Sequence, residues 1–262
     1  MDDNYQTYLN RLARLTLPEA HRSQAQHIQE SSKFQANSGV REATSFPGYT
    51  LITPPAEEES ENSAFYGKLQ IYQQELLQLP VNPDLIVPVP PASFHLTLAD
   101  LIWDNAFVDA RETNPQFDRE LHSCVAEIFQ QYQQSMTNRN HPIKWGMLGL
   151  ILMPRAVAVC LVPQDERSYD EIIQFRRTIY QNPKLIALGI EQHYHLTAHI
   201  TLAYFGEVPS DLDRTNFSTL LSQLNQKWLL NLPEFLINRV ELRKFDDMTR
   251  YYREPDWPIL EF

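Results

Sequence analysis

Two short segments of the chain repeat one pattern of side chains that can carry out chemistry. In residues 94–98 and 198–202, a histidine stands two positions before a threonine within an otherwise apolar run. The pairs are His95 with Thr97 and His199 with Thr201. Side chains alternate between the two faces of an extended strand, so each histidine is expected to point to the same side as its threonine. An imidazole and a hydroxyl therefore project together at two places.

These four side chains are suited to a phosphate bound between the two segments. Polar groups buried in apolar strands cost free energy unless they have partners, so a polar ligand is expected there. Two imidazoles can act as general acid and general base near neutral pH, and hydroxyls can donate hydrogen bonds to non-bridging phosphate oxygens. The expected catalytic residues are His95 and His199. The expected phosphate-binding residues are Thr97 and Thr201, and the chemistry requires no metal and no cofactor.

The spacing of the motif is not specific by itself. A histidine two positions before a serine or threonine also occurs at His21, in a polar segment, and at His195, just before the second motif. About one such match is expected by chance in a chain of this length. Each histidine alone could be satisfied by backbone carbonyl groups inside a sheet, and threonine is common in strands. The apolar framing and the paired context favour His95 and His199.

A metal site is the competing interpretation. His193, His195 and His199 would lie on one face of a continuous strand, and three imidazoles can bind zinc. No cysteine or carboxylate cluster accompanies them in the sequence, and a zinc site would leave His95 and Thr97 without a role. The phosphate interpretation is therefore preferred.

Other residues could complete a nucleotide site. The basic candidates, among which the sequence does not choose, are Arg41, Lys144, Arg155, Arg176 and Arg177. Arg176 and Arg177 follow an amphipathic helix pattern and are expected on its solvated face. Trp103 and Tyr204 follow the two motifs and could stack on a base, although aromatic residues at strand ends more often close a core.

The elements around the two motifs follow the same order in both halves of the chain. Apolar residues at helical spacing predict a helix over residues 65–79 before the first motif, and a capping sequence at Ser168 predicts a helix before the second. A helix is expected after each motif, over residues 117–132 and 217–228. Strands are expected over residues 143–153, 156–162 and 235–242. This order implies an α+β fold of two related lobes.

The two lobes define the expected domain organisation. Residues 1–45 are polar, show only a weak helical pattern and are expected to be an N-terminal extension. Residues 46–140 would form the first His-x-Thr lobe and residues 141–262 the second. Together they would make one compact bilobal domain, since a chain of 262 residues is long enough to bury a single substantial core.

Composition limits the partners and the compartment. The 22 Lys and Arg against 33 Asp and Glu give a net charge of −11, which opposes tight binding of long nucleic acid. A small nucleotide or an RNA terminus suits this charge better. No run of about 18 apolar residues occurs and the first residues lack a signal-peptide layout, so a cytoplasmic protein without membrane contact is expected. Cys124 and Cys160 are expected to be reduced core residues, and the protein to be a monomer.

Three stretches carry a resemblance to a known family. They are Phe46-Pro47-Gly48-Tyr49-Thr50, residues 90–97, which end in the first His-x-Thr motif, and residues 198–204, which contain the second. In these stretches the chain resembles the 2H phosphoesterase superfamily, which includes 2′,3′-cyclic nucleotide phosphodiesterases and the so-called 2′-5′ RNA ligases. It is most similar to an uncharacterised bacterial branch, over roughly residues 34–245.

The resemblance implies both a fold and an activity. The fold would have antiparallel sheets that face a central cleft, with helices outside. His95 and His199 would be the acid and the base, and the two threonines would hold the phosphate. The implied reaction is metal-independent hydrolysis of a cyclic, 2′,3′-type phosphodiester of a nucleotide or RNA end. Two alternatives stay open: a module that binds a nucleotide or RNA end without turnover, and 2′-5′ RNA end-joining by the same chemistry in reverse.

Overall fold

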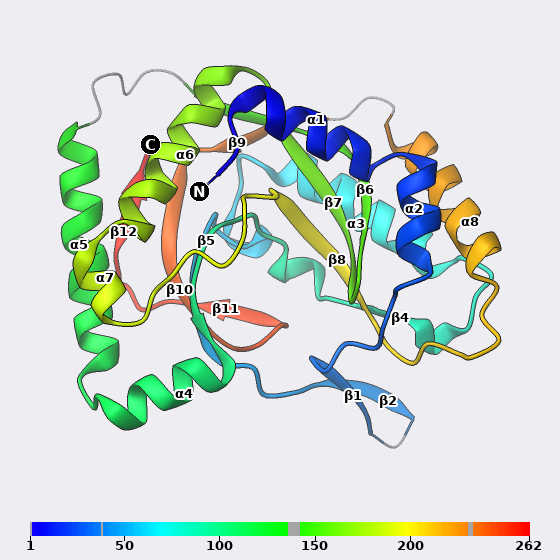
Figure 1. Ribbon diagram of the computed structural model, residues 1–262, viewed down its shortest axis with the longest axis horizontal. Helices are drawn as coiled ribbons and strands as arrows, with labels where there is room; N and C mark the ends of the chain where they lie inside the picture. Colours follow the sequence, from blue (N-terminus) through cyan, green and yellow to red (C-terminus); the bar gives the residue numbers. More distant parts are fainter. Residues whose placement is uncertain (1, 38, 136–141, 230–232) are drawn as a thin grey trace.

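The computed structural model describes residues 2–37, 39–135, 142–229 and 233–262. In this part of the chain the strands pair antiparallel and form two five-stranded sheets and a small hairpin (Figure 1). The first sheet has the order β11 (Arg250–Tyr252), β10 (Arg239–Asp247), β3 (Gly48–Ile52) and β5 (Thr97–Trp103), with β12 (Ile259–Glu261) also paired to β10. The second has the order β4 (Ile86–Pro88), β8 (His199–Phe205), β7 (Ala156–Pro163), β6 (Ile143–Met153) and β9 (Phe235–Ile237). The hairpin pairs β1 (Phe34–Asn37) with β2 (Val40–Ala43).

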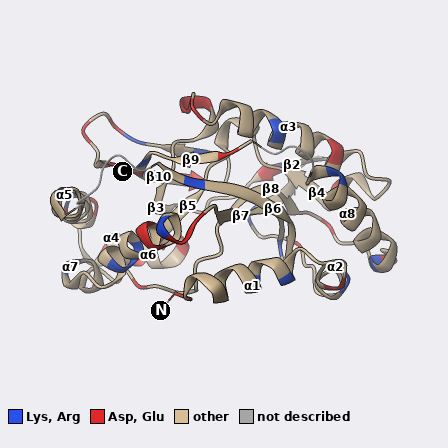
Figure 2. Cartoon of the chain, turned by 90° about the horizontal axis from the view of Figure 1, so that it is seen from above, with Lys and Arg blue, Asp and Glu red and all other residues tan. Residues whose placement is uncertain are grey.

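Helices lie outside the sheets. They are α1 (Tyr5–Leu15), α2 (Pro18–Ala25), α3 (Ser63–Leu77), α4 (Asp104–Thr113), α5 (Phe117–Ser135), α6 (Glu166–Tyr180), α7 (Pro183–Ala187) and α8 (Arg214–Trp228). Short 3-10 turns are η1 (Ala56–Glu58), η2 (Pro83–Leu85) and η3 (Pro91–Ser93). Helix α1 packs against β6 and β7, whereas α3 packs on the other side against β4 and β8 (Figure 2). The expectation of a mixed fold of helices and antiparallel sheets is confirmed.

Local sequence explains where the helices begin and which face they bury. Phe117, Leu121, Ile128 and Tyr132 form a buried stripe at helical spacing on α5, as their periodicity predicts. One boundary was predicted wrongly, since α6 is capped by Asp165 and not by Ser168. The Asp165 side chain accepts a hydrogen bond from the Ser168 backbone N–H at 2.7 Å, so the helix begins earlier.

The strands do not divide between the sheets at the middle of the chain. The predicted lobe boundary at residue 140 lies outside the described residues, but β4 belongs to the second sheet and β10 to β12 belong to the first. The segment 235–242, expected as one strand, is in fact two. Phe235–Ile237 pairs with β6, and after Asn238 the chain enters β10 and pairs with β3. Each sheet therefore combines strands from both halves.

Residues of the N-terminal 45-residue segment, expected to be an extension, pack against the sheets and α6. Tyr8 and Leu12 on α1 are fully buried, and the Tyr8 hydroxyl donates a hydrogen bond to the Leu161 carbonyl at 2.9 Å. Asp2 forms an ion pair with Arg176 on α6, and both side chains are 2% exposed. The apolar stripe of α1, which includes Tyr8, Leu12 and Leu15, is short and lies in an otherwise polar segment, so the sequence alone did not show that it is buried.

Other expectations concern the cysteines and the membrane. Cys124 and Cys160 are both free and buried, as predicted. Within the described ranges the structure contains no helix with the length and apolar character needed to cross a bilayer.

Candidate active site

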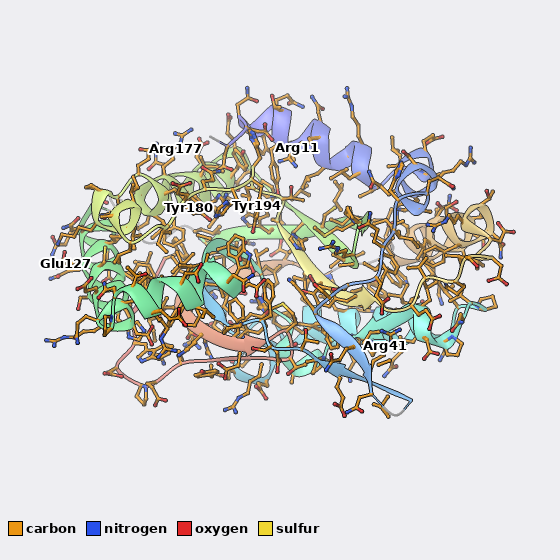
Figure 3. All side chains as sticks on the ribbon, turned by 60° about the horizontal axis from the view of Figure 1, so that its bottom comes forward. Arg11, Arg41, Glu127, Arg177, Tyr180 and Tyr194 are labelled. Carbon is orange, nitrogen blue, oxygen red and sulfur yellow. The ribbon has the colours of Figure 1, made fainter. Side chains whose placement is uncertain are left out.

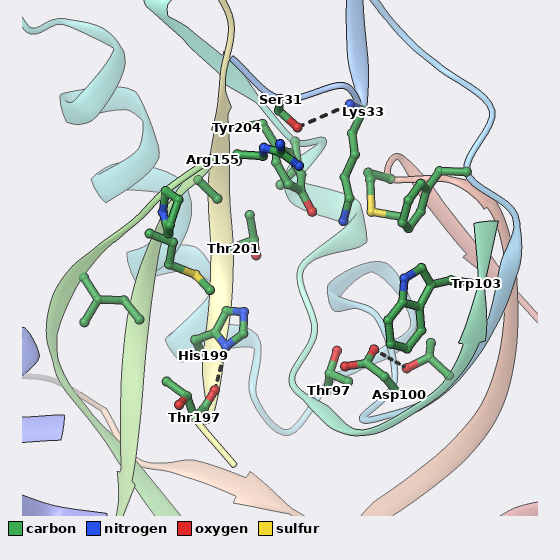
Figure 4. Close-up of a pocket in the computed structure, with 18 of the residues that line it drawn as sticks. Ser31, Lys33, Thr97, Asp100, Trp103, Arg155, Thr197, His199, Thr201 and Tyr204 are labelled. Atoms are coloured by element: carbon green, nitrogen blue, oxygen red, sulfur yellow. Dashed lines mark hydrogen bonds between the residues drawn. The ribbon is translucent and has the colours of Figure 1, made fainter. Parts of the chain in front are cut away.

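The two His-x-Thr pairs line one pocket of about 1110 Å³. His95 and Thr97 come from the entry to β5 in the first sheet, and His199 and Thr201 from β8 in the second. All four side chains are half-buried. Figure 4 shows His199 and Thr201 on one wall and Thr97 on the opposite wall. The predicted site residues are therefore brought together from different sheets.

Both histidines are held by the same backbone contact. Nδ1 of His95 lies 2.7 Å from the Ser93 carbonyl oxygen, and Nδ1 of His199 lies 2.6 Å from the Thr197 carbonyl oxygen. A carbonyl oxygen can only accept, so Nδ1 donates its proton in each case. The neutral imidazole then keeps its lone pair on Nε2, which is the nitrogen available for proton transfer. One difference from the predicted strand is that His95 precedes β5 and follows the turn η3.

A bulge after Thr97 redirects the side chains of β5. In its pairing with β3, Ile52 lies opposite Thr97 and Leu51 opposite Ala99, so Leu98 is an extra residue. A second irregularity follows before Ile102. Strict alternation would turn Ala99 and Leu101 toward the pocket, but Asp100 lines it instead, and after the second irregularity Trp103 faces the pocket again.

Strand β8 has the equivalent bulge after Thr201. Ala158 of β7 lies opposite Thr201 and Val157 opposite Ala203, so Leu202 is the extra residue. Tyr204 then lines the pocket, three positions after its threonine, as Asp100 does on β5. The sequence suggested Trp103 and Tyr204 only by their proximity to the motifs, and it gave no signal for Asp100.

The backbone carbonyl of each bulged leucine accepts a hydrogen bond from a buried side chain on a helix. Arg176 Nη1 on α6 donates to the Leu98 carbonyl at 2.5 Å, and Gln73 Nε2 on α3 donates to the Leu202 carbonyl at 2.7 Å. Arg176 is 2% exposed, so its expected place on a solvated helix face is wrong. Its charge is balanced by Asp2, with 2.9 Å between Nε and Oδ2.

The two histidines are electrostatically different. Burial, the largest cause, lowers the pKa of His95 to about 4. Burial also lowers the pKa of His199, but the carboxylate of Asp100 opposes this shift. Asp100 itself accepts hydrogen bonds from the hydroxyls of Thr50 and Tyr194, and burial raises its pKa. His199 is therefore the histidine with a negative partner in the pocket.

Two cations line the pocket at some distance from the motifs. Lys33 comes from the segment between α2 and β1, and Arg155 from the turn between β6 and β7. Arg155 was one of the basic candidates, whereas Lys33 was missed because its segment was taken for an extension. The Lys33 ammonium lies 4.4 Å from the centre of the Phe46 ring and 5.2 Å from that of Tyr204.

Two of the other basic candidates, Arg41 and Lys144, form ion pairs outside the pocket. Arg41 pairs with Glu30 at 2.5 Å, and Lys144 with Glu234 at 2.9 Å. The Arg41 side chain is only 13% exposed, whereas Arg177 is exposed on α6, near the edge of the molecule in Figure 3.

The geometry gives little support to the competing His195–Thr197 motif or to a zinc site. His195 and Thr197 also line the pocket, but the His195 side chain is 59% exposed and lies 3.5 Å from Asp3. The Thr197 hydroxyl already accepts a hydrogen bond from Arg11 at 2.8 Å. Residues 193–198 precede β8 and are not part of a strand. No group of three or more His, Cys, Asp or Glu side chains that could hold a metal ion occurs in the part of the chain that the structure describes.

Comparisons with known proteins concern the fold. No protein-family model and no curated protein sequence matches the chain. The structure is similar to the crystal structure of a conserved protein of unknown function from Agrobacterium tumefaciens, with a TM-score of 0.58 and 16% identity, over 88% of this chain and 94% of that one. This likeness shows a shared fold.

Two further solved structures are more distant. Escherichia coli LigT complexed with 3′-AMP has a TM-score of 0.43 and 13% identity, over 83% of this chain and 98% of that one. A protein described as a phosphoesterase has a TM-score of 0.38 and 14% identity, over 82% and 99%.

Proposed function

We propose that the protein hydrolyses a 2′,3′-type cyclic phosphodiester of a nucleotide or RNA end, with His95 and His199 as the acid–base pair and without a metal. Thr97 and Thr201 bind the non-bridging oxygens of the phosphate. The observation that carries the proposal is the meeting of the two His-x-Thr pairs in one pocket, with each Nδ1 held by a carbonyl two residues earlier. The family resemblance of the sequence points to the same reaction.

The surroundings of the two histidines assign their roles. His95, with a pKa of about 4, is neutral at neutral pH and accepts the proton of the attacking water on Nε2. His199 has Asp100 beside it, which favours its protonated form, and the bound phosphate adds further negative charge. The water oxygen forms the new bond to phosphorus. The bond to one ribose oxygen breaks, and that oxygen takes the proton from His199, leaving a phosphate monoester.

The test is turnover of a panel of nucleoside 2′,3′-cyclic phosphates by purified protein in the presence of EDTA. His95→Ala and His199→Ala should each lower kcat by about 10²–10⁴, the usual contribution of general acid or base catalysis. Thr97→Ala and Thr201→Ala should cost roughly 10², as expected for one hydrogen bond to developing charge. His27→Ala is the matched control, because His27 is exposed and lies outside the pocket, and it should retain wild-type turnover.

Three outcomes would contradict the proposal. Near wild-type turnover in the double histidine variant would put the active site elsewhere. Binding of cyclic phosphates without any product would favour the binding module. Accumulation of joined product with a 5′-hydroxyl acceptor would favour the end-joining reaction.

A further inference from the structure

The pocket continues beyond the two motifs, and its far end carries positive charge. Lys33, Arg155 and Tyr204 gather at this end in Figure 4, Thr201 lies between, and His199 lies at the opposite end. The proposed hydrolysis uses neither of the two cations. Their placement needs a separate explanation.

The strand β8 sets the separation between the two ends. His199 begins β8 and Tyr204 stands five positions later, with one bulged residue between them. At 3.2–3.4 Å per residue, their backbones are about 13–17 Å apart. Arg155 belongs to the Tyr204 end, because its carbonyl accepts a hydrogen bond from the Phe205 backbone N–H at 3.0 Å. Arg155 is therefore anchored about one strand length from His199, whereas the Lys33 ammonium lies between the two ends and acts on His199 through space.

The two cations share this end without an acid bonded to either. Among the described residues, no ion pair or side-chain hydrogen bond joins Lys33 or Arg155 to an acceptor. Asp100 and Asp104 act on Lys33 only through space. Burial, the largest cause, lowers the pKa of Lys33, and the charge of Arg155 lowers it further. Placing the half-buried Lys33 ammonium near a second cation is unfavourable, and an anion bound between the two would offset this cost.

Aromatic rings fix the position of the ammonium. Lys33 Nζ lies over the faces of Phe46 and Tyr204, and the Tyr204 ring is itself packed against Phe34 with ring centres 5.6 Å apart. A cation over ring faces is stabilised but keeps its N–H donors for another partner. Arg155 is exposed and supplies a planar guanidinium that suits phosphate oxygens.

We propose that Lys33 and Arg155 form a second anion subsite, which binds a phosphate of the substrate other than the one that is hydrolysed. This subsite proposal rests on the proposed function, because that function identifies the cyclic phosphate that is cleaved. The preferred substrates then carry a cyclic phosphate at one end of a nucleotide and a second phosphate on its 5′ side. That second phosphate is either a terminal monoester or the diester link to a preceding nucleotide.

The experiment compares three substrates in steady-state assays. They are adenosine 2′,3′-cyclic phosphate, the same compound with a 5′-phosphate, and a diadenosine dinucleotide ending in a 2′,3′-cyclic phosphate. For the wild type, KM should be at least about tenfold lower for one or both two-phosphate substrates, since each charge-assisted hydrogen bond is strong. Whichever of the two has the lower KM identifies the source of the second phosphate.

Variants then test the two residues. Lys33→Met and Arg155→Met should each bring the KM values of the one- and two-phosphate substrates to within about threefold of each other. Lys68→Met is the control, because Lys68 is exposed on α3 outside the pocket, and it should keep the wild-type ratio. Equal KM values in the wild type would overturn the subsite. A Lys33→Met variant that raises KM equally for every substrate would overturn it too, because Lys33 would then act on the scissile phosphate.

Equilibrium binding separates this proposal from the proposed function. By calorimetry, adenosine 3′,5′-bisphosphate should bind the wild type at least about tenfold more tightly than adenosine 3′-monophosphate, and Arg155→Met should lose this preference. If no cyclic phosphate is turned over but the preference is present, the hydrolysis proposal fails and the subsite stands. If turnover is present without the preference, the subsite fails alone.

Discussion

At the scale of single residues, the two histidines share one backbone contact but differ in their electrostatic surroundings. His95 has an aromatic neighbour, Tyr251, with ring centres 4.1 Å apart, whereas His199 is influenced by the carboxylate of Asp100. A neutral base and a protonated acid are both required for the proposed reaction. The pH range in which both conditions hold follows from the directions of their pKa values.

The first prediction is a pH optimum on the acidic side for kcat/KM of a 2′,3′-cyclic phosphate. Activity should fall as pH drops toward about 4, because His95 becomes protonated and can no longer accept a proton. It should also fall as pH rises through the pKa of His199, which burial lowers from its ordinary value, because the acid loses its proton. The measurement is kcat/KM as a function of pH in the free enzyme.

The second prediction concerns the carboxylate beside His199. Asp100→Asn removes a negative charge that raises the pKa of His199, so the alkaline limb of the profile should move to lower pH while the acidic limb stays near its position. Asp109→Asn, on the exposed face of α4, is the control and should leave both limbs in place. An alkaline limb that does not move would assign that limb to a group other than His199.

At the scale of elements, the two bulges decide which side chains reach the pocket. Leu98 and Leu202 occupy the extra positions, and their carbonyls accept hydrogen bonds from Arg176 and Gln73. The N-terminal segment takes part through Asp2, which neutralises Arg176 and also accepts a hydrogen bond from the Leu196 backbone N–H at 2.7 Å. Residues far apart in sequence therefore set the geometry of β5.

The third prediction is a large loss of stability on removal of Asp2. Asp2→Ala leaves the Arg176 guanidinium buried without its counter-charge, and breaking a buried pair from one side costs about 3–5 kcal/mol. Asp3→Ala is the matched control. It removes the more exposed pair with Arg11, where the side chains are 31% and 13% exposed, and should cost about 1 kcal/mol or less. Urea unfolding of the two variants measures the difference, and equal losses would refute a special role for Asp2.

The sequence predicted the elements better than it predicted their pocket-facing residues. His95 with Thr97 and His199 with Thr201 are two residues apart, so a local sequence pattern was enough to select them as candidates. Asp100 could not be found in this way, because a bulge breaks the alternation on which the reasoning depends.

The assignment of strands to sheets could not be predicted for a different reason. Nothing in the short run Ile86–Pro88 distinguishes a strand of the first sheet from one of the second, because both sheets bury similar apolar side chains. Lys33 was missed since only tertiary packing brings its polar segment into the pocket.

At the scale of the whole molecule, the halves of the chain are interleaved. Strand β4 completes the second sheet, and β10 to β12 complete the first. Neither half of the chain forms a full sheet by itself. Helix α1, near the start of the sequence, packs against β6 and β7, near its middle.

The fourth prediction is that the two sheets unfold together. Because each sheet needs strands from both halves, loss of one removes partners from the other, and a single cooperative transition is expected. The unfolding transition followed by far-ultraviolet circular dichroism should coincide with the one followed by fluorescence of Trp145 in β6 or of Trp103 in β5. Each fluorescence signal is recorded in a variant in which the other three of the four tryptophans are replaced by phenylalanine. Transitions at separate urea concentrations would show that the sheets are independent.

The late arrival of β10 has a consequence during synthesis on the ribosome. Strand β3 ends at residue 52 and its neighbour β10 starts at residue 239. At about 5–20 residues per second, roughly 10–40 s of translation separate the two, and throughout this interval one hydrogen-bonding edge of β3 has no partner in the nascent chain. An open strand edge is a template for pairing with other chains. Newly made molecules of this protein are therefore expected to depend on holding chaperones until β10 emerges, and to aggregate when translation stalls between β3 and β10.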